Sequence, residues 1–170
     1  MRKLLIVTCL LVLGSALHVS GQISTFKALF LYNFTQNIEW PGPAAGNGDF
    51  VITVIGDSEM AAELEKLAKV RKVGTRKMLV RKVNNVDEVG DAHIVFLAAS
   101  KSSLMPMLDS YQKGKSVLMV ADKSGLCRQG AGIAFTTIEG KLRYEICTER
   151  IEEHGLKVSH KLITLGKKVQ

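Results

Sequence analysis

Residues 26–41 read FKALFLYNFTQNIEWP, and this stretch decides the fold. At helical spacing, its large apolar side chains and one upstream residue fall on a single stripe, with Leu29 beside it. The stripe consists of Ile23, Phe26, Phe30, Phe34 and Ile38. Trp40 and Pro41 end the helix, because proline disfavours helical backbone in the residue before it. We therefore expect an amphipathic helix that the rest of the chain must cover.

The chain begins with the features of a secretory signal peptide. Arg2 and Lys3 give a positive start, an apolar run covers residues 4–17, and small residues follow up to Gly21. The run is short for a membrane span, although an uncleaved N-terminal anchor is the alternative. We expect residues 1–21 to be removed by cleavage near Gly21. The remaining residues 22–170 would then form a periplasmic or secreted protein.

The remaining composition indicates one globular domain with a modest positive charge. Loss of Arg2 and Lys3 lowers the formal net charge from +7 to +5, because residues 1–21 contain no acidic residue. The basic residues are scattered and few aromatic residues lie among them, so we do not expect a nucleic-acid partner. The length suffices for one domain with a sizeable core, and no linker or repeat divides it.

The middle of the chain alternates apolar strands with helices. The predicted strands are residues 50–55, 78–83, 93–98 and 117–121, and the predicted helices are residues 60–70 and 104–111. Runs that are apolar on both faces are typical of strands in a parallel sheet covered by helices on either side. The sequence therefore predicts an α/β fold with a mostly parallel sheet of five to six strands and helices on both faces.

A C-terminal antiparallel hairpin is predicted to end this sheet. Residues 132–138 and 141–147 alternate in polarity, and Glu139-Gly140 forms a two-residue turn between them. The turn sets the register, in which Ile133 faces Ile146, Phe135 faces Tyr144, and Thr137 faces Leu142. These pairs share one face, which is therefore predicted to face the core. Two short helices, at residues 148–154 and 159–165, would complete the domain.

Two cysteines remain after cleavage, Cys127 and Cys147. The hairpin turn places Cys147 opposite Gly132, and Cys127 lies five residues further back. An extended segment would separate the two by roughly 16 Å, whereas a disulfide needs Cα atoms within about 7 Å. We therefore expect no bridge within one chain, unless Gly130 folds the segment back. A free thiol, with Cys127 in a loop the better placed, could instead join two chains.

The sequence contains no pattern that indicates catalysis or metal binding. Ser110 and Lys113 match a Ser-x-x-Lys spacing, but the companion motifs of that enzyme class are missing. His93, His154 and His160 do not pair at metal-ligand spacing. His93 opens a buried strand, where a hydrogen-bonded core histidine is more common than a ligand. We expect a protein that is not an enzyme and has no cofactor or metal.

Short motifs in order along the chain resemble the YfiR-like family. The first motif is Lys27-Ala28-x-x-Leu31-Tyr32-Asn33-Phe34 followed by Glu39-Trp40-Pro41. The later matches begin at Phe50, Gly56, His93, Lys115, Gly132, Arg143 and Gly155. Each piece is short, but the ordered set spans nearly all of residues 22–170. Tyr32, Asn33, Phe34, Trp40 and Pro41 would form the structural helix motif of the family.

The resemblance implies a small α/β periplasmic protein that binds the sensor region of a membrane diguanylate cyclase and represses it. It also implies a non-catalytic protein that forms homodimers. Glu145 and Ile151 would lie on the partner-binding face, although an outward strand residue and a core residue are the ordinary interpretations of these positions. Family members often carry a cysteine at the position of Ala92, and a local bridge from Cys127 would need a partner near Ala134. Neither position is a cysteine here, so we do not expect redox control by those bridges.

A small-molecule binding module is the alternative function. It would feed another membrane signalling protein, such as a histidine kinase. Arg128, Lys157 and Ser159 could supply polar groups for a small anionic ligand, while Lys157 could equally be a solvated surface residue. Stabilisation of the folded protein by such a ligand would distinguish this function from direct repression.

Overall fold

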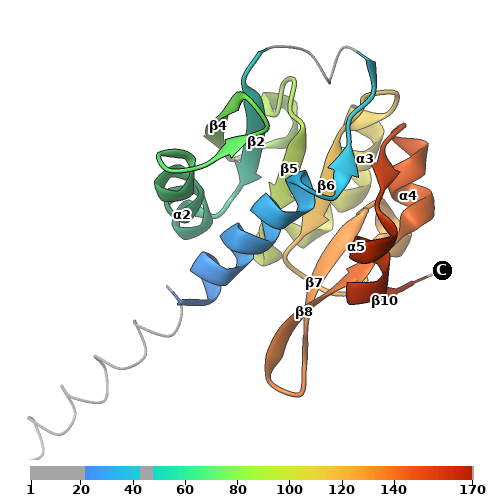
Figure 1. Cartoon of the computed structure of the whole chain (residues 1–170). Coiled ribbons are helices and arrows are strands. Elements are labelled where there is room, and N and C mark those ends of the chain that lie inside the picture. Colours follow the sequence, from blue (N-terminus) through green and yellow to red (C-terminus); the bar gives the residue numbers. More distant parts are fainter. Residues whose placement is uncertain (1–21, 43–47, 170) are drawn as a thin grey trace, which may run out of the picture.

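The computed structural model describes residues 22–42 and 48–169. The predicted signal peptide and its cleavage site lie outside these residues. A helix over residues 22–35 leads into the short strand β1 (Ile38–Glu39). This helix runs across one face of a curled sheet (Figure 1). The fold thus places the stretch that we identified first against the strands.

The main sheet has eight strands in the order β10-β8-β7-β6-β5-β2-β4-β3. Their bounds are β2 Phe50–Ile55, β3 Lys72–Val73, β4 Arg76–Val83, β5 Ile94–Leu97, β6 Leu118–Ala121, β7 Ile133–Ile138, β8 Lys141–Ile146 and β10 Lys167–Lys168. β4, β2, β5, β6 and β7 pair in parallel, β8 pairs antiparallel with β7, and β3 antiparallel with β4. The α/β class is confirmed. The prediction of a mostly parallel sheet with five to six strands is wrong in detail, because the sheet is mixed and a two-residue strand extends each edge.

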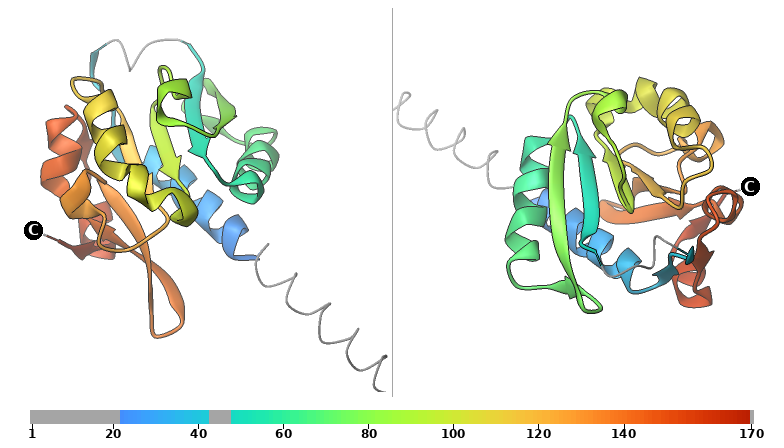
Figure 2. Two further views of the ribbon diagram at one scale, coloured as in Figure 1. Left: turned by 180° about the vertical axis from the view of Figure 1, so that it is seen from behind. Right: turned by 90° about the horizontal axis from the view of Figure 1, so that it is seen from above.

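Helices cover both faces of the main sheet, as the views from behind and from above show (Figure 2). The remaining bounds are α2 Ser58–Ala68, η2 Val86–Glu88, η3 Ala99–Leu104, α3 Met105–Gln112, η4 Cys127–Gln129, α4 Thr148–Glu153, β9 Lys157–Val158 and α5 His160–Leu165. One core lies beneath residues 22–35 and α2, and a second lies beneath η2 and α3. The sheet therefore separates two apolar layers, as expected for strands buried on both faces.

The N-terminal helix is buried along a different line from the predicted stripe. Ala28, Leu31 and Phe34 are buried, whereas Ile23 and Phe26 are 43% and 50% exposed. Apolar residues occupy more than half of the helix circumference, so periodicity indicated a wide apolar face without locating its centre. The sequence predicted the helix, but the extent of its stripe was wrong at the N-terminal end. The predicted end at Trp40 and Pro41 was also wrong, because the helix ends at residue 35 and Ile38–Glu39 form β1.

The hairpin register agrees with the prediction at each pair. Ile133 lies opposite Ile146, Phe135 opposite Tyr144, and Thr137 opposite Leu142. Phe34 of the N-terminal helix packs on this face, with ring centroids 6.1 Å from Phe135 and 5.3 Å from Tyr144. The hairpin and the first helix therefore stabilise each other, although more than 90 residues separate them in sequence.

Trp40 anchors the segment that follows the N-terminal helix. Its side chain is 8% exposed and meets Phe50 edge-on at 5.0 Å between ring centroids. Its indole Nε1 donates a hydrogen bond to the His93 carbonyl oxygen at 3.1 Å. Immediately before it, β1 pairs antiparallel with β9 (Lys157–Val158), so both ends of the domain meet here.

We predict that Trp40→Ala lowers the free energy of unfolding by ~3–5 kcal/mol, because it removes a buried aromatic side chain and leaves a cavity. Phe26→Ala is the matched control, since it truncates a half-exposed aromatic residue on the helix that precedes Trp40. That control should cost much less. Urea unfolding of both variants tests the prediction, and equal losses would contradict it.

Candidate functional site: the surface around the Cys127–Cys147 disulfide

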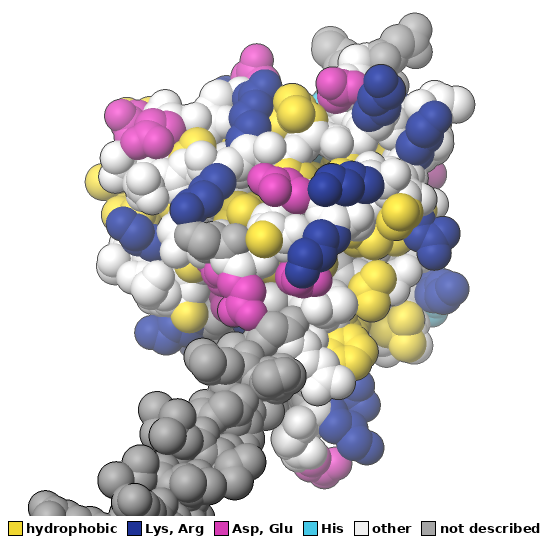
Figure 3. Space-filling view, turned by 90° about the vertical axis from the view of Figure 1, so that its left-hand side faces the viewer, with side chains coloured by type: hydrophobic (Ala, Val, Ile, Leu, Met, Phe, Trp, Pro, Cys, Tyr) yellow, Lys and Arg dark blue, Asp and Glu magenta, His cyan; other side chains and the backbone are white. Residues whose placement is uncertain are grey.

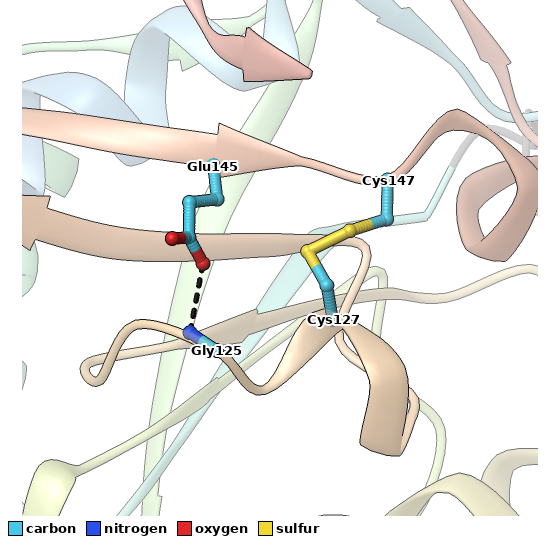
Figure 4. The surroundings of a disulfide bond; sticks show 4 residues. All are labelled: Gly125, Cys127, Glu145 and Cys147. Carbon is cyan, nitrogen blue, oxygen red and sulfur yellow. Dashed lines mark hydrogen bonds between the residues drawn. A yellow bond between two sulfur atoms is a disulfide. The ribbon is translucent and has the colours of Figure 1, made fainter. Parts of the chain in front are cut away.

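Cys127 and Cys147 form a disulfide within the chain, with Cα atoms 5.9 Å apart (Figure 4). The prediction of two free thiols is therefore wrong. The predicted position of Cys147 is correct, since its backbone N–H donates to the Gly132 carbonyl at 2.9 Å. The error lies in the assumed extended segment. Residues 127–129 form the turn η4, and Gly130, at φ 120°, folds the chain back.

Glu145 lies beside the disulfide on β8 and is 9% exposed. Its carboxylate Oε2 accepts a hydrogen bond from the Gly125 backbone N–H at 2.7 Å (Figure 4). A carboxylate that accepts a backbone N–H makes a stronger bond than a neutral acceptor. Glu145 therefore holds the loop before η4 against the sheet. Its partner Gly125 lies two residues before Cys127, which the disulfide links to the sheet.

Ile151 lies on α4 (Thr148–Glu153) and is 1% exposed. Its side chain packs over Gly132, where an added Cβ would lie 2.8 Å from the Ile151 Cγ1 atom. The absence of a side chain at Gly132 is thus what lets α4 settle on the sheet. Neither side chain is displayed on the surface around the disulfide, because Glu145 holds the loop before η4 and Ile151 is buried in the first core.

The surface itself contains a pocket of about 250 Å³. Cys127, Arg128, Cys147, Glu149, Arg150 and Val169 line it. Arg150 also pairs with Glu153 along α4 at 2.7 Å, whereas Arg128 is exposed on η4. Cys127 and Cys147 are only 2% and 5% exposed, so the pocket presents mainly the charged side chains around the disulfide.

The three predicted ligand-binding residues do not converge. Arg128 lines the disulfide pocket, which neither Lys157 nor Ser159 borders. Lys157 is exposed, and its backbone lies opposite that of Glu39 in the antiparallel pairing of β9 with β1. The Ser159 hydroxyl accepts from the Leu162 N–H at 3.3 Å and donates to Asn37 Oδ1 at 3.1 Å. Ser159 therefore caps α5 and connects it to the N-terminal helix.

The residues of the predicted helix motif contribute to packing. Phe34 and Trp40 are buried in the first core, as described above. The Tyr32 hydroxyl donates to the Lys72 carbonyl at 3.3 Å, and Asn33 and Pro41 are exposed. The motif thus anchors the helix at two points and leaves one polar side chain, Asn33, on its outer face.

Arg76 and His93 form a polar cluster that the sequence did not indicate. The His93 Nδ1 accepts from the Val51 N–H at 3.0 Å, so the expectation of a hydrogen-bonded core histidine is confirmed. Its Nε2 lies 2.7 Å from Arg76 Nη2, and the Arg76 guanidinium lies over the Phe50 ring at 5.4 Å. These partners explain why His93 is held at the start of β5 rather than presented to a ligand.

An ion pair between Lys27 and Asp122 also went unpredicted. The Lys27 Nζ lies 2.6 Å from Asp122 Oδ1, and the two side chains are only 16% and 12% exposed. Burial raises the pKa of Asp122 above its ordinary value, and the attraction of Lys27 offsets this only in part. Asp57, which caps α2, adds a smaller repulsion that also raises the pKa. The pair fixes the helix on the sheet, but it stabilises the fold little.

Among residues 22–42 and 48–169 there is no group of three or more His, Cys, Asp or Glu side chains placed to bind a metal ion. In the same residues, no helix is long and apolar enough to span a membrane. On the face that carries α2, Lys and Arg side chains are dispersed and acidic side chains lie between them (Figure 3). Hydrophobic side chains gather on this face toward the protruding hairpin.

The fold defines a small α/β module with a mixed sheet covered by helices. Residues 24–167 match the model of the family described as YfiR/HmsC-like, and the chain belongs to that family. The predicted resemblance is thereby confirmed. The family is a regulatory, non-catalytic one.

No curated protein matches the sequence significantly. Two solved structures share the fold at low sequence identity. One is the ABC domain in complex with L-tryptophan from Streptococcus pneumoniae, at 9% identity and a TM-score of 0.52, over 71% of this chain and 55% of that one. The other is a conserved domain protein from Vibrio cholerae, at 10% identity and a TM-score of 0.57, over 86% of this chain and 60% of that one. The chain thus spans little more than half of either structure.

We predict that the Cys127→Ser/Cys147→Ser variant loses about 3 kcal/mol of stability, since the bridge closes a loop with a sequence separation of 20. Mass spectrometry of non-reduced monomer should also yield a linked Cys127–Cys147 peptide. Two thiols that can both be alkylated in the native monomer would contradict the bridge.

The raised pKa of Asp122 predicts a pH dependence of known sign. Ionising this carboxyl costs more in the folded protein than in the unfolded chain, so its contribution to stability is lost as pH rises from about 4 through the raised pKa. The stability of the wild type relative to Asp122→Asn should therefore fall between pH 4 and neutrality. Urea titrations across this range test it, with the exposed Asp91→Asn as control. A relative stability that rises with pH would contradict the prediction.

Proposed function

We propose that this protein is a non-catalytic periplasmic regulator that binds the sensor region of a membrane signalling protein and represses it. The observation that carries the proposal is the match of residues 24–167 to the YfiR/HmsC-like family. By analogy with the resemblance described above, the partner is a diguanylate cyclase and the output is cyclic-di-GMP. A leader removed near Gly21 would deliver the protein to that compartment.

The partner contacts the surface around the disulfide. Glu145 and Ile151, the residues first expected on this face, are buried, whereas Arg128, Glu149 and Arg150 line its pocket. The disulfide and the Glu145–Gly125 hydrogen bond hold residues 125–127 in one conformation in the free protein. A rigid loop loses less conformational entropy on binding, which favours affinity.

The protein also associates with itself. The exposed edge strands and the exposed apolar side chains Ile23, Phe26 and Leu29 provide surfaces for a second copy. Sedimentation at tens of micromolar would show a dimer, and a monomer alone would count against self-association.

We predict that the double reversal Arg128→Glu/Arg150→Glu abolishes repression while the protein still folds. Cyclic-di-GMP measured in cells that express the variant should rise to the level of cells that lack the protein. The matched control is Lys69→Glu/Lys82→Glu, which changes the charge equally on the α2 and β4 side and should preserve repression.

Two outcomes would overturn the proposal. Deletion of the protein without any change in cyclic-di-GMP would remove the cyclase as target. Equal loss of repression in both reversal variants would show that general charge, and not the disulfide surface, governs the contact. Circular dichroism of each variant confirms that the fold is retained.

A further inference from the structure

A second and larger pocket lies away from the disulfide surface, between the N-terminal helix, β8 and α5. Its volume is about 570 Å³, within the range of sites that bind small molecules. Phe30 and Asn33 border it from the helix, Arg143 and Tyr144 from β8, and Lys161 and Leu165 from α5. None of these residues belongs to the ligand set that the sequence suggested.

The inner part of the pocket is aromatic. The Phe30 and Tyr144 rings meet edge-on at 5.9 Å, and Phe34 meets Tyr144 edge-on at 5.3 Å. The Tyr144 hydroxyl already donates to the Leu162 carbonyl at 2.7 Å, so it is not available to a ligand. Burial raises the pKa of Tyr144 to about 12, which keeps this hydroxyl neutral. The inner surface therefore suits an apolar or aromatic group.

The outer part of the pocket is cationic. Arg143 and Lys161 are exposed there, and no carboxylate among the described residues forms an ion pair with either. The Arg143 guanidinium donates one long hydrogen bond, 3.4 Å, to the carbonyl of its neighbour Leu142. The exposed Asn33 side chain adds an amide that can donate. Two cations without acidic partners beside an aromatic floor favour an anion.

We propose that this pocket binds a small anion that carries an aromatic or other apolar group, such as an aromatic carboxylate. The ring would pack on Phe30 and Tyr144, and the carboxylate would receive charge-assisted hydrogen bonds from Arg143 and Lys161. This assignment stands independently of the membrane partner. It moves ligand binding from Arg128, Lys157 and Ser159 to a site formed by both ends of the domain.

Four related probes separate the two features of the pocket. 3-Phenylpropionate has the ring and the negative charge, propionate has the charge alone, 3-phenylpropan-1-ol has the ring alone, and 3-phenylpropylamine has the opposite charge. We expect 3-phenylpropionate to bind at least about tenfold more tightly than any of the others, because it alone combines the ring with a charge that strengthens hydrogen bonds from Arg143 and Lys161. Amide shifts in NMR titrations of the purified protein should concentrate around Asn33 and Leu165.

Two variants with equal loss of charge locate the site. Arg143→Gln/Lys161→Gln should weaken 3-phenylpropionate about tenfold, to the level of the alcohol. Lys141→Gln/Lys157→Gln changes two cations outside the pocket and should leave its affinity unchanged. Lack of binding at tens of millimolar, equal binding of the acid and the alcohol, or a loss of affinity only in the Lys141/Lys157 variant would each overturn the proposal.

Discussion

The contact between Phe34 and the inner face of the hairpin is the interaction on which the rest of the structure depends. Phe34 is fully buried against Phe135 and Tyr144, so the first helix and the last two long strands of the sheet form one core. Burial of one such side chain contributes about 1.5–3 kcal/mol, and neighbouring residues of the same helix add to it. With the helix fixed, Asn37 meets Ser159 and β1 meets β9, which positions the C-terminal segment.

This C-terminal segment connects the two surfaces discussed above. α5 borders the larger pocket and continues into β10 (Lys167–Lys168), which pairs in parallel with β8 beside Glu145. The next residue, Val169, donates to the Ile146 carbonyl at 3.0 Å and lines the disulfide pocket. The C-terminal segment therefore runs continuously from the larger pocket to the disulfide pocket.

The sequence predicted what depends on local pattern and missed what depends on tertiary placement. The buried strands, the first helix and the hairpin register followed from apolar periodicity and from the Glu139-Gly140 turn. The strands β3 and β10 have two residues each and are mostly lysine, so no pattern distinguished them. The disulfide depended on one backbone angle at Gly130. Arg143 and Lys161 are ordinary basic residues in sequence, and only the fold brings them to one pocket.

Hydrogen exchange with the partner present tests the central claim most directly. The protein would be mixed with the purified periplasmic sensor region of the membrane signalling protein proposed as its partner. The account predicts slower exchange in residues 123–129 and in α4, where the disulfide surface lies, and unchanged exchange in α2. Protection confined to α2 and the adjoining β3–β4 edge, or no protection in any segment, would contradict it.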